Sequence, residues 1–204
     1  MNWIKDFIPT IKRNISQTFG NDKDSKIPEG LWKSCDKCGS ILYIPELKKN
    51  SYVCSKCSHH FKVNVTERID ITFDKDTYVN LNDAEQFNDY LQFKDTKKYK
   101  DRYQDALAKS DADEAISIGT GKVLGKDIVV AIFEFDFLGG SMGAVVGKRF
   151  TKAVDYAVEH NFPLVAFSTS GGARMQESMI SLFQMGKTAA AVKKLKKKKL
   201  PFIS

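Results

Sequence analysis

The 204-residue chain contains no long apolar run. No stretch approaches the roughly 18 to 20 residues that a membrane-spanning helix needs, and the N-terminus lacks the apolar segment and small-residue cleavage site of a secretory signal. Hydrophobic residues nevertheless make up 42% of the chain, enough for one sizeable core and a small satellite module. We therefore expect a globular, cytoplasmic protein without a membrane span.

Acidic residues are fewer than basic ones, and the formal net charge is +7. Much of this excess comes from one segment, VKKLKKKKL at residues 192–200, which holds six lysines. Without these lysines the net charge falls to about +1. The overall charge is therefore weak evidence for a nucleic-acid partner, and we interpret the lysine run as a solvated helix face.

Histidine is scarce, with only three in the chain. His59 and His60 adjoin a cysteine-rich block and His160 falls at an expected helix end, so no nucleophile triad is evident. The sequence also lacks the Gly-Lys-Ser/Thr ending of a P-loop and the Gly-x-Gly-x-x-Gly of a dinucleotide-binding fold. Nucleoside-triphosphate and nicotinamide chemistry are therefore unsupported.

The cysteines form two Cys-x-x-Cys pairs, CDKC and CSKC. They are Cys35, Cys38, Cys54 and Cys57. Two such turns on facing hairpins can complete a closed, tetrahedral zinc site of the ribbon type. Two disulfides would conflict with a cytoplasmic location, and a redox dithiol would not need a second matching pair. We predict one structural zinc ion, with His59 and His60 left as exposed polar residues.

The pattern along the chain divides it into three parts. Residues 1–30 are expected to be a peripheral segment and linker, because apolar residues at helical spacing are interrupted by Pro9 and followed by a polar stretch. This segment could touch a membrane surface, although docking against the protein itself is the simpler interpretation. Residues 31–65 are expected to form the ribbon, and residues 66–204 the main domain.

The main domain is expected to be an α/β layer. Two β-rich runs around a turn at Gly125-Lys126 predict a hairpin, and apolar positions from Val146 to Val158 predict a helix. FPLVAFS predicts a buried strand, a second helix continues through the lysine run, and LPFIS opens another strand. This order predicts parallel pairing. Because the chain stops inside the pattern, we expect the last strand to have little to pair with and the domain to be incomplete.

Two segments place adjacent glycines between an apolar strand and a helix. They are FEFDFLGGSMGAVVGKRF at residues 133–150 and FSTSGGARMQES at residues 167–178. Adjacent glycines bring backbone N–H groups close to a ligand, and the following helix start adds a positive dipole end. Each segment can therefore form an anion or oxyanion site, and a tight turn without a ligand is the alternative.

The four-cysteine ribbon, FDFLGGSMGAVVG and PLVAFSTSGGARMQESMISLFQMGKTAAA together resemble the carboxyltransferase β subunit of the multi-subunit bacterial or plastid acetyl-CoA carboxylase, from about Leu31 to Ser204. The resemblance implies a crotonase-like ββα spiral after an N-terminal zinc ribbon. It implies transfer of a carboxyl group from biotin on a carrier protein to acetyl-CoA, giving malonyl-CoA for fatty-acid synthesis. The implied partners are an α subunit in an α2β2 assembly, the biotin carboxyl carrier protein and biotin carboxylase.

The resemblance also assigns site residues. Gly171 and Gly172 match the glycine pair whose backbone N–H groups stabilise the thioester enolate. The turn that lines the acyl-CoA pocket matches Gly139, Gly140, Ser141, Met142 and Gly143. Arg174 would either contact a CoA phosphate or hold the loop through an ion pair, and we favour the ion pair. The family's mechanism assigns the proton to biotin, so the chain needs no general base.

Two other classes of function stay open. A zinc-ribbon nucleic-acid binder would place aromatic and basic residues on one ribbon face. The candidates for that face are Trp32, Lys33, Tyr43, Tyr52 and Lys56. A truncated, catalytically silent assembly subunit would follow from the abrupt C-terminus.

Overall fold

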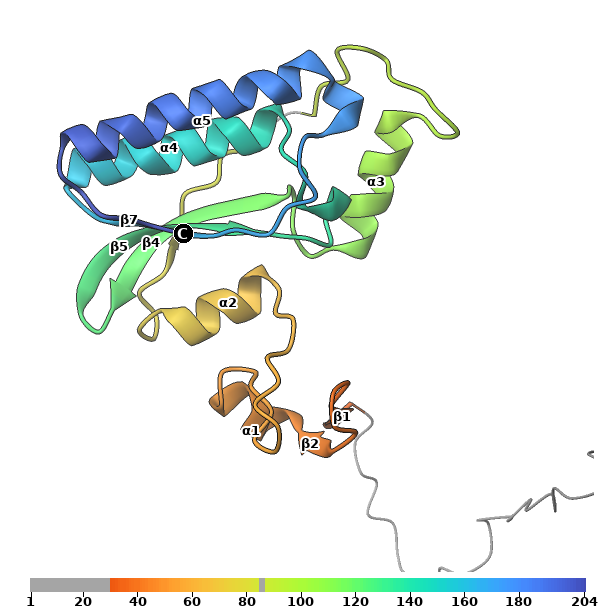
Figure 1. Ribbon diagram of the computed structural model, residues 1–204, viewed down its shortest axis with the longest axis vertical. Coiled ribbons are helices and arrows are strands. Elements are labelled where there is room, and N and C mark those ends of the chain that lie inside the picture. The colour runs from red at the N-terminus through yellow and green to blue at the C-terminus, as the bar shows by residue number, and fades with distance from the viewer. Residues whose placement is uncertain (1–29, 85–86) are drawn as a thin grey trace, which may run out of the picture.

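The computed structural model describes residues 30–84 and 87–204, so the expected N-terminal segment falls almost wholly outside the described residues. The described chain forms a small ribbon and a larger α/β layer, with helix α2 (Val65–Thr72) between them (Figure 1). In the ribbon, β1 (Trp32–Ser34) pairs antiparallel with β2 (Ile41–Tyr43), and helix α1 (Ile44–Lys49) follows directly. Asn64 and Glu67 form a reciprocal capping box that starts α2.

The larger part is built on a five-stranded sheet with the order β3-β4-β5-β6-β7. Its strands are β3 (Val79–Asn80), β4 (Ile116–Val123), β5 (Lys126–Phe133), β6 (Leu164–Phe167) and β7 (Phe202–Ile203). The first three strands pair antiparallel, whereas β5 with β6 and β6 with β7 pair parallel. The predicted hairpin and the predicted parallel pairing are therefore confirmed.

Two details of the sheet differ from expectation. The hairpin turn falls at Leu124 and Gly125, one residue earlier than predicted, and both residues have a positive φ. The last strand was expected to have little to pair with, and this was wrong. Phe202 pairs with Leu164 and Ile203 with Val165, because the crossover through the second long helix returns the chain alongside β6.

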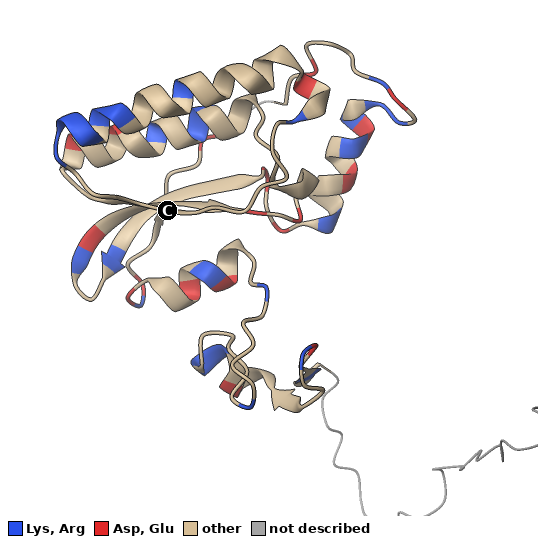
Figure 2. Cartoon of the chain, in the orientation of Figure 1, with Lys and Arg blue, Asp and Glu red and all other residues tan. Residues whose placement is uncertain are grey.

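Three further helices accompany the sheet. They are α3 (Tyr99–Lys109), α4 (Ala144–His160) and α5 (Met179–Lys197), with short 3₁₀ turns η1 (Leu138–Gly140) and η2 (Met175–Glu177). Helices α4 and α5 lie side by side over one face of the sheet, and α2 lies on the other side (Figure 1). The six lysines of the run are exposed and gather at the C-terminal end of α5 (Figure 2). No helix within the described ranges is both long and apolar enough to span a membrane.

The core lies between the sheet and the two long helices. Its fully buried side chains include Ile116, Ile118, Val129, Val146, Val154 and Leu164. Burying an aliphatic side chain of this size stabilises the fold by about 1.5–3 kcal/mol. On β6, Leu164 and Ala166 are buried in this core, whereas Val165 and Phe167 alternate onto the opposite face. The ribbon has a separate core around Leu47, Tyr52 and Phe61.

Alanine substitutions at the two helical glycines of the α4–α5 pair should change the free energy of unfolding in opposite directions. A Cβ added at Gly147 in α4 would lie 2.9 Å from Gln184 Cβ in α5, whereas a Cβ at Gly186 would meet no atom within 4 Å. We expect Gly147→Ala to destabilise the protein through overpacking, and Gly186→Ala to stabilise it by up to about 1 kcal/mol through helix propensity. Urea unfolding of both variants measures this. Equal effects would contradict the close packing of α4 on α5.

Candidate functional site

The two glycine turns lie side by side at one edge of the sheet. Because Ile132 of β5 and Phe167 of β6 are parallel neighbours, the chain segments that leave both strands emerge at the same carboxyl edge. Three backbone hydrogen bonds then join the turns. Gly171 N–H donates to Gly139 O at 2.8 Å, Met142 N–H to Gly172 O at 2.8 Å, and Arg174 N–H to Met142 O at 3.2 Å. The structure therefore brings the predicted pair and its companion turn into one unit.

Glycine is required at several points of this unit. Gly139 and Gly140 both have φ 66°, and Gly172 has φ 107°, a region that residues with a Cβ rarely adopt. A Cβ at Gly140 would also lie 3.3 Å from Ser170 Cα in the other turn. The missing side chains therefore permit both the turn geometry and the close approach of the two backbones.

The donors of the predicted glycine pair differ in availability. Gly171 N–H donates to Gly139 O inside the paired turns. Gly172 N–H donates to Ser170 Oγ at 3.1 Å, and Ser170 is exposed. Since a hydroxyl can rotate away, Gly172 can offer its N–H to a ligand without separating the turns, whereas Gly171 cannot.

Arg174 is buried and belongs to the interior of the site. Its side chain is 1% exposed and pairs with Glu114, which is also 1% exposed, at an Nη2–Oε1 distance of 2.5 Å. Arg174 Nε donates to Ser141 Oγ at 3.2 Å and Nη2 to Ser141 O at 2.8 Å. Burial opposes the charged form, but the charge and hydrogen bonds of Glu114 outweigh it and raise the pKa of Arg174. This geometry supports the ion-pair role and leaves no guanidinium surface for a CoA phosphate.

Further buried groups complete the network, and sequence reasoning missed them. Glu177 Oε1 accepts from Tyr99 Oη at 2.7 Å, and its Oε2 accepts from Ala144 N–H at 2.6 Å. Ser181 Oγ donates to Met142 O at 2.6 Å. Burial raises the pKa of Tyr99, so its hydroxyl remains a donor. The Glu177 carboxylate thus lies at the start of α4, where the helix dipole favours a negative charge.

The four cysteines converge in the ribbon. Cys35 Sγ lies 3.6 Å from Cys57 Sγ, Cys38 Sγ lies 3.9 Å from Cys54 Sγ, and all four sulfur atoms fall within 4.8 Å of one another. A tetrahedral site with Zn–S bonds of about 2.3 Å requires sulfur atoms about 3.8 Å apart, so the cysteines fit a zinc ion. The Ser40 hydroxyl lowers the pKa of Cys38 to about 6, whereas burial raises the pKa of Cys57 to about 12.

The residues close to the cysteines in the sequence include Gly39, His59 and His60. Gly39 has φ 69° directly after the first cysteine pair. His59 is half-buried with its ring 5.3 Å from Phe61, and His60 is exposed. Neither histidine belongs to the cysteine cluster among the residues searched. The four thiols alone therefore make up the ligand set.

The five ribbon residues of the nucleic-acid alternative do not share one exposed face. Trp32, Tyr43 and Lys56 line one hollow. Tyr52 is 7% exposed and packs in the ribbon core, while Lys33 lies over the Phe61 ring. The structure therefore gives this alternative only part of the surface that it needs.

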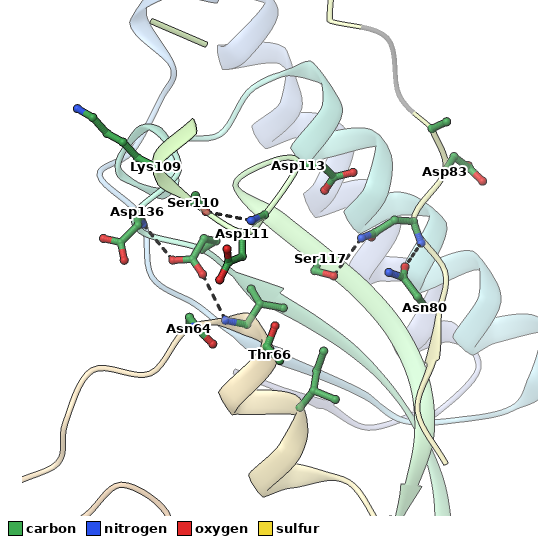
Figure 3. Close-up of a pocket in the computed structure, with 16 residues that line it drawn as sticks. Asn64, Thr66, Asn80, Asp83, Lys109, Ser110, Asp111, Asp113, Ser117 and Asp136 are labelled. Carbon is green, nitrogen blue, oxygen red and sulfur yellow. Dashed lines mark hydrogen bonds between the residues drawn. The ribbon is translucent and has the colours of Figure 1, made fainter. Parts of the chain in front are cut away.

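A separate hollow of about 520 Å³ lies between the start of α2, the segment after β3 and the start of β4 (Figure 3). Its acidic lining residues include Asp83, Asp111, Asp113, Glu134 and Asp136. Hydrogen bonding to Arg149 lowers the pKa of Asp113, which keeps that carboxylate charged. None of the predicted site residues lines this hollow, and its carboxylates would repel a phosphorylated ligand.

Comparison with known proteins finds two families. Residues 62–204 match the carboxyl transferase domain, and residues 32–57 match the acetyl-CoA carboxylase zinc finger domain. The match confirms the predicted crotonase-like α/β fold behind a four-cysteine ribbon.

Two solved structures agree with this fold. A transcarboxylase 12S hexamer with bound methylmalonyl-coenzyme A is 22% identical with a TM-score of 0.50, over 74% of this chain and 25% of that one. A single-chain, multi-domain long-chain acyl-CoA carboxylase is 17% identical with a TM-score of 0.53, over 78% of this chain and 15% of that one. The chain therefore spans a quarter or less of the length of these proteins.

Metal removal should unfold the ribbon selectively. We expect chelation, or Cys54→Ser, to lower bound zinc from about one ion per chain and to expose the ribbon core, because zinc binding contributes folding free energy. The sheet should remain folded, since its core is separate. Zinc content and limited proteolysis measure this, with Ser55→Ala as the control. A ribbon that stays protease-resistant without zinc would contradict the assignment.

The buried pair in the glycine unit should matter far more than an exposed pair. We expect Arg174→Gln to lower the free energy of unfolding by roughly 3–5 kcal/mol, because Glu114 is left as an uncompensated buried charge. Lys122→Gln, which removes the exposed partner of Asp127, should change it little. Denaturant unfolding compares the two. Similar losses in both variants would show that the Arg174 network is not the stabilising element described here.

Proposed function

This chain belongs to the carboxyl transferase domain family, matched over residues 62–204, and from that premise we propose that it is the β subunit of a biotin-dependent acetyl-CoA carboxyltransferase. The proposed reaction moves a carboxyl group from biotin on a carrier protein to the methyl carbon of acetyl-CoA and gives malonyl-CoA for fatty-acid biosynthesis. The acetyl-CoA carboxylase zinc finger match at residues 32–57 favours acetyl-CoA among the acyl-CoA thioesters that could accept the carboxyl group. A cytoplasmic location accompanies this proposal.

The observation that carries the proposal is the pairing of the two glycine turns. A carbanion next to a thioester is stabilised when charge moves onto the thioester oxygen, so the protein must supply hydrogen-bond donors at that oxygen. Backbone N–H groups in rigid turns are suitable donors because they need no reorganisation during the reaction. The hydrogen bonds between Gly171, Met142 and their partners supply that rigidity.

Gly172 is the residue of the predicted pair that we assign as donor. The thioester oxygen would replace the Ser170 hydroxyl as acceptor of Gly172 N–H, an interaction worth roughly 3 kcal/mol at the transition state in other enzymes. Gly171 would hold the turns together through Gly139, and the segment 139–143 would line the acyl-CoA pocket. When bound, the carrier's biotin supplies the carboxyl group and accepts the methyl proton.

An exposed apolar surface beside the site supports the proposed assembly. Exposed large side chains on η2 and α5 are Met175, Met179, Leu182, Phe183 and Met185. Apolar patches of this kind mark contacts with other proteins. We assign the α subunit of an α2β2 assembly to this surface, with biotin carboxyl carrier protein and biotin carboxylase as the further partners.

The donor role of Gly172 predicts a large rate effect. In an enzyme reconstituted with an α subunit and biotinylated carrier, we expect Gly172→Val to slow malonyl-CoA formation about 100-fold or more, because the oxyanion donor is displaced. Gly125→Val is the matched control, since Gly125 also has a positive φ but lies at the exposed hairpin tip. Turnover of Gly172→Val at the rate of the control would refute the assignment.

A further inference from the structure

Arg68 of α2 lies beneath the carboxyl end of β6. Its guanidinium carbon is 4.9 Å from the ring centroid of Phe167, the last residue of that strand. Phe167 alternates onto the sheet face opposite the long helices, where α2 lies (Figure 1). The chain continues from Phe167 directly into the exposed segment 168–172. Arg68 is therefore placed at the sheet edge that carries both glycine turns.

The charge of Arg68 is left without an anionic partner. Within residues 30–84 and 87–204, the Arg68 side chain makes no ion pair or hydrogen bond, and the contact of its guanidinium is the Phe167 ring. Glu67 beside it is engaged in the capping box with Asn64. The neighbouring cation Lys62 also lies over a ring, that of Phe135, but it pairs with Asp136 at 2.5 Å.

This placement suits a phosphate. A guanidinium presents a planar set of donors that matches phosphate oxygens, and stacking on an aromatic ring fixes its orientation. In open α/β sheets, ligands bind outside the carboxyl ends of the strands. The phosphates of coenzyme A are separated from the thioester by the pantetheine arm, so they must bind away from the oxyanion donor. Gly172 comes five positions after Phe167, so the backbones of these two residues are at most roughly 17 Å apart.

We propose that Arg68 binds a phosphate group of the acyl-CoA, an inference that rests on the proposed function. Arg68 acts on substrate affinity, and it does not touch the reacting carbon. The phosphate contact can be tested separately from the rest of the substrate, because pantetheine contains the same arm as coenzyme A but no phosphates.

The test compares coenzyme A with pantetheine as probes, using calorimetry on the full-length chain. Arg68→Gln should weaken binding of coenzyme A about tenfold and leave binding of pantetheine unchanged, because one charge-assisted hydrogen-bonded contact is lost. Arg68→Lys, which keeps the charge, should recover part of the affinity. Lys62→Gln is the matched control and should bind coenzyme A like the unaltered chain, since its charge is already paired.

The contrary outcomes separate a failure of the phosphate role from a failure of the proposed function. If Arg68→Gln binds coenzyme A as tightly as the unaltered chain, the phosphate role is wrong and the proposed function stands. If Arg68→Gln loses both probes equally, Arg68 supports the fold of the site and the phosphate role is again wrong. If the unaltered chain binds neither probe, the proposed function fails together with this inference. A thermal melt of each variant confirms that it is folded.

Discussion

The ion pair between Arg174 and Glu114 holds the two glycine turns in one unit. Both side chains are buried, and a buried charge is tolerated only when its hydrogen bonds are made. The guanidinium satisfies this requirement by contacting Glu114 on one side and Ser141 of the companion turn on the other. Arg174 comes two positions after Gly172 in the chain. The position of the Gly172 backbone therefore depends on the ion pair between Arg174 and Glu114.

The sheet brings together the two glycine turns that the Arg174–Glu114 ion pair connects. Parallel pairing of β5 with β6 sends both glycine segments out of one edge, and α2 brings a cation to the opposite face at that edge. The ribbon depends on its own core and on a cysteine cluster suited to zinc. The glycine turns and the cysteine cluster thus lie in separate parts of the chain, and a loss of zinc need not disturb the turns.

Local patterns predict much of this molecule, and long-range contacts account for what they miss. The hairpin, the α4 helix, β6 and the four cysteines follow from periodicity and spacing, which act over a few residues. Glu114 stands 60 residues before Arg174, and nothing near it marks it as a partner. The hydrogen bond from Gly171 to Gly139 likewise forms only when two strands pair, and no local pattern predicts it.

Amide NMR during titration with acetyl-CoA tests whether the joined glycine turns bind the acyl-CoA thioester. We expect saturable shifts of the amide signals of Gly172 and of residues 139–143, while the Gly171 amide keeps its protection from hydrogen exchange and the ribbon signals stay in place. Shifts confined to the ribbon, with the turns unchanged at saturation, would contradict it.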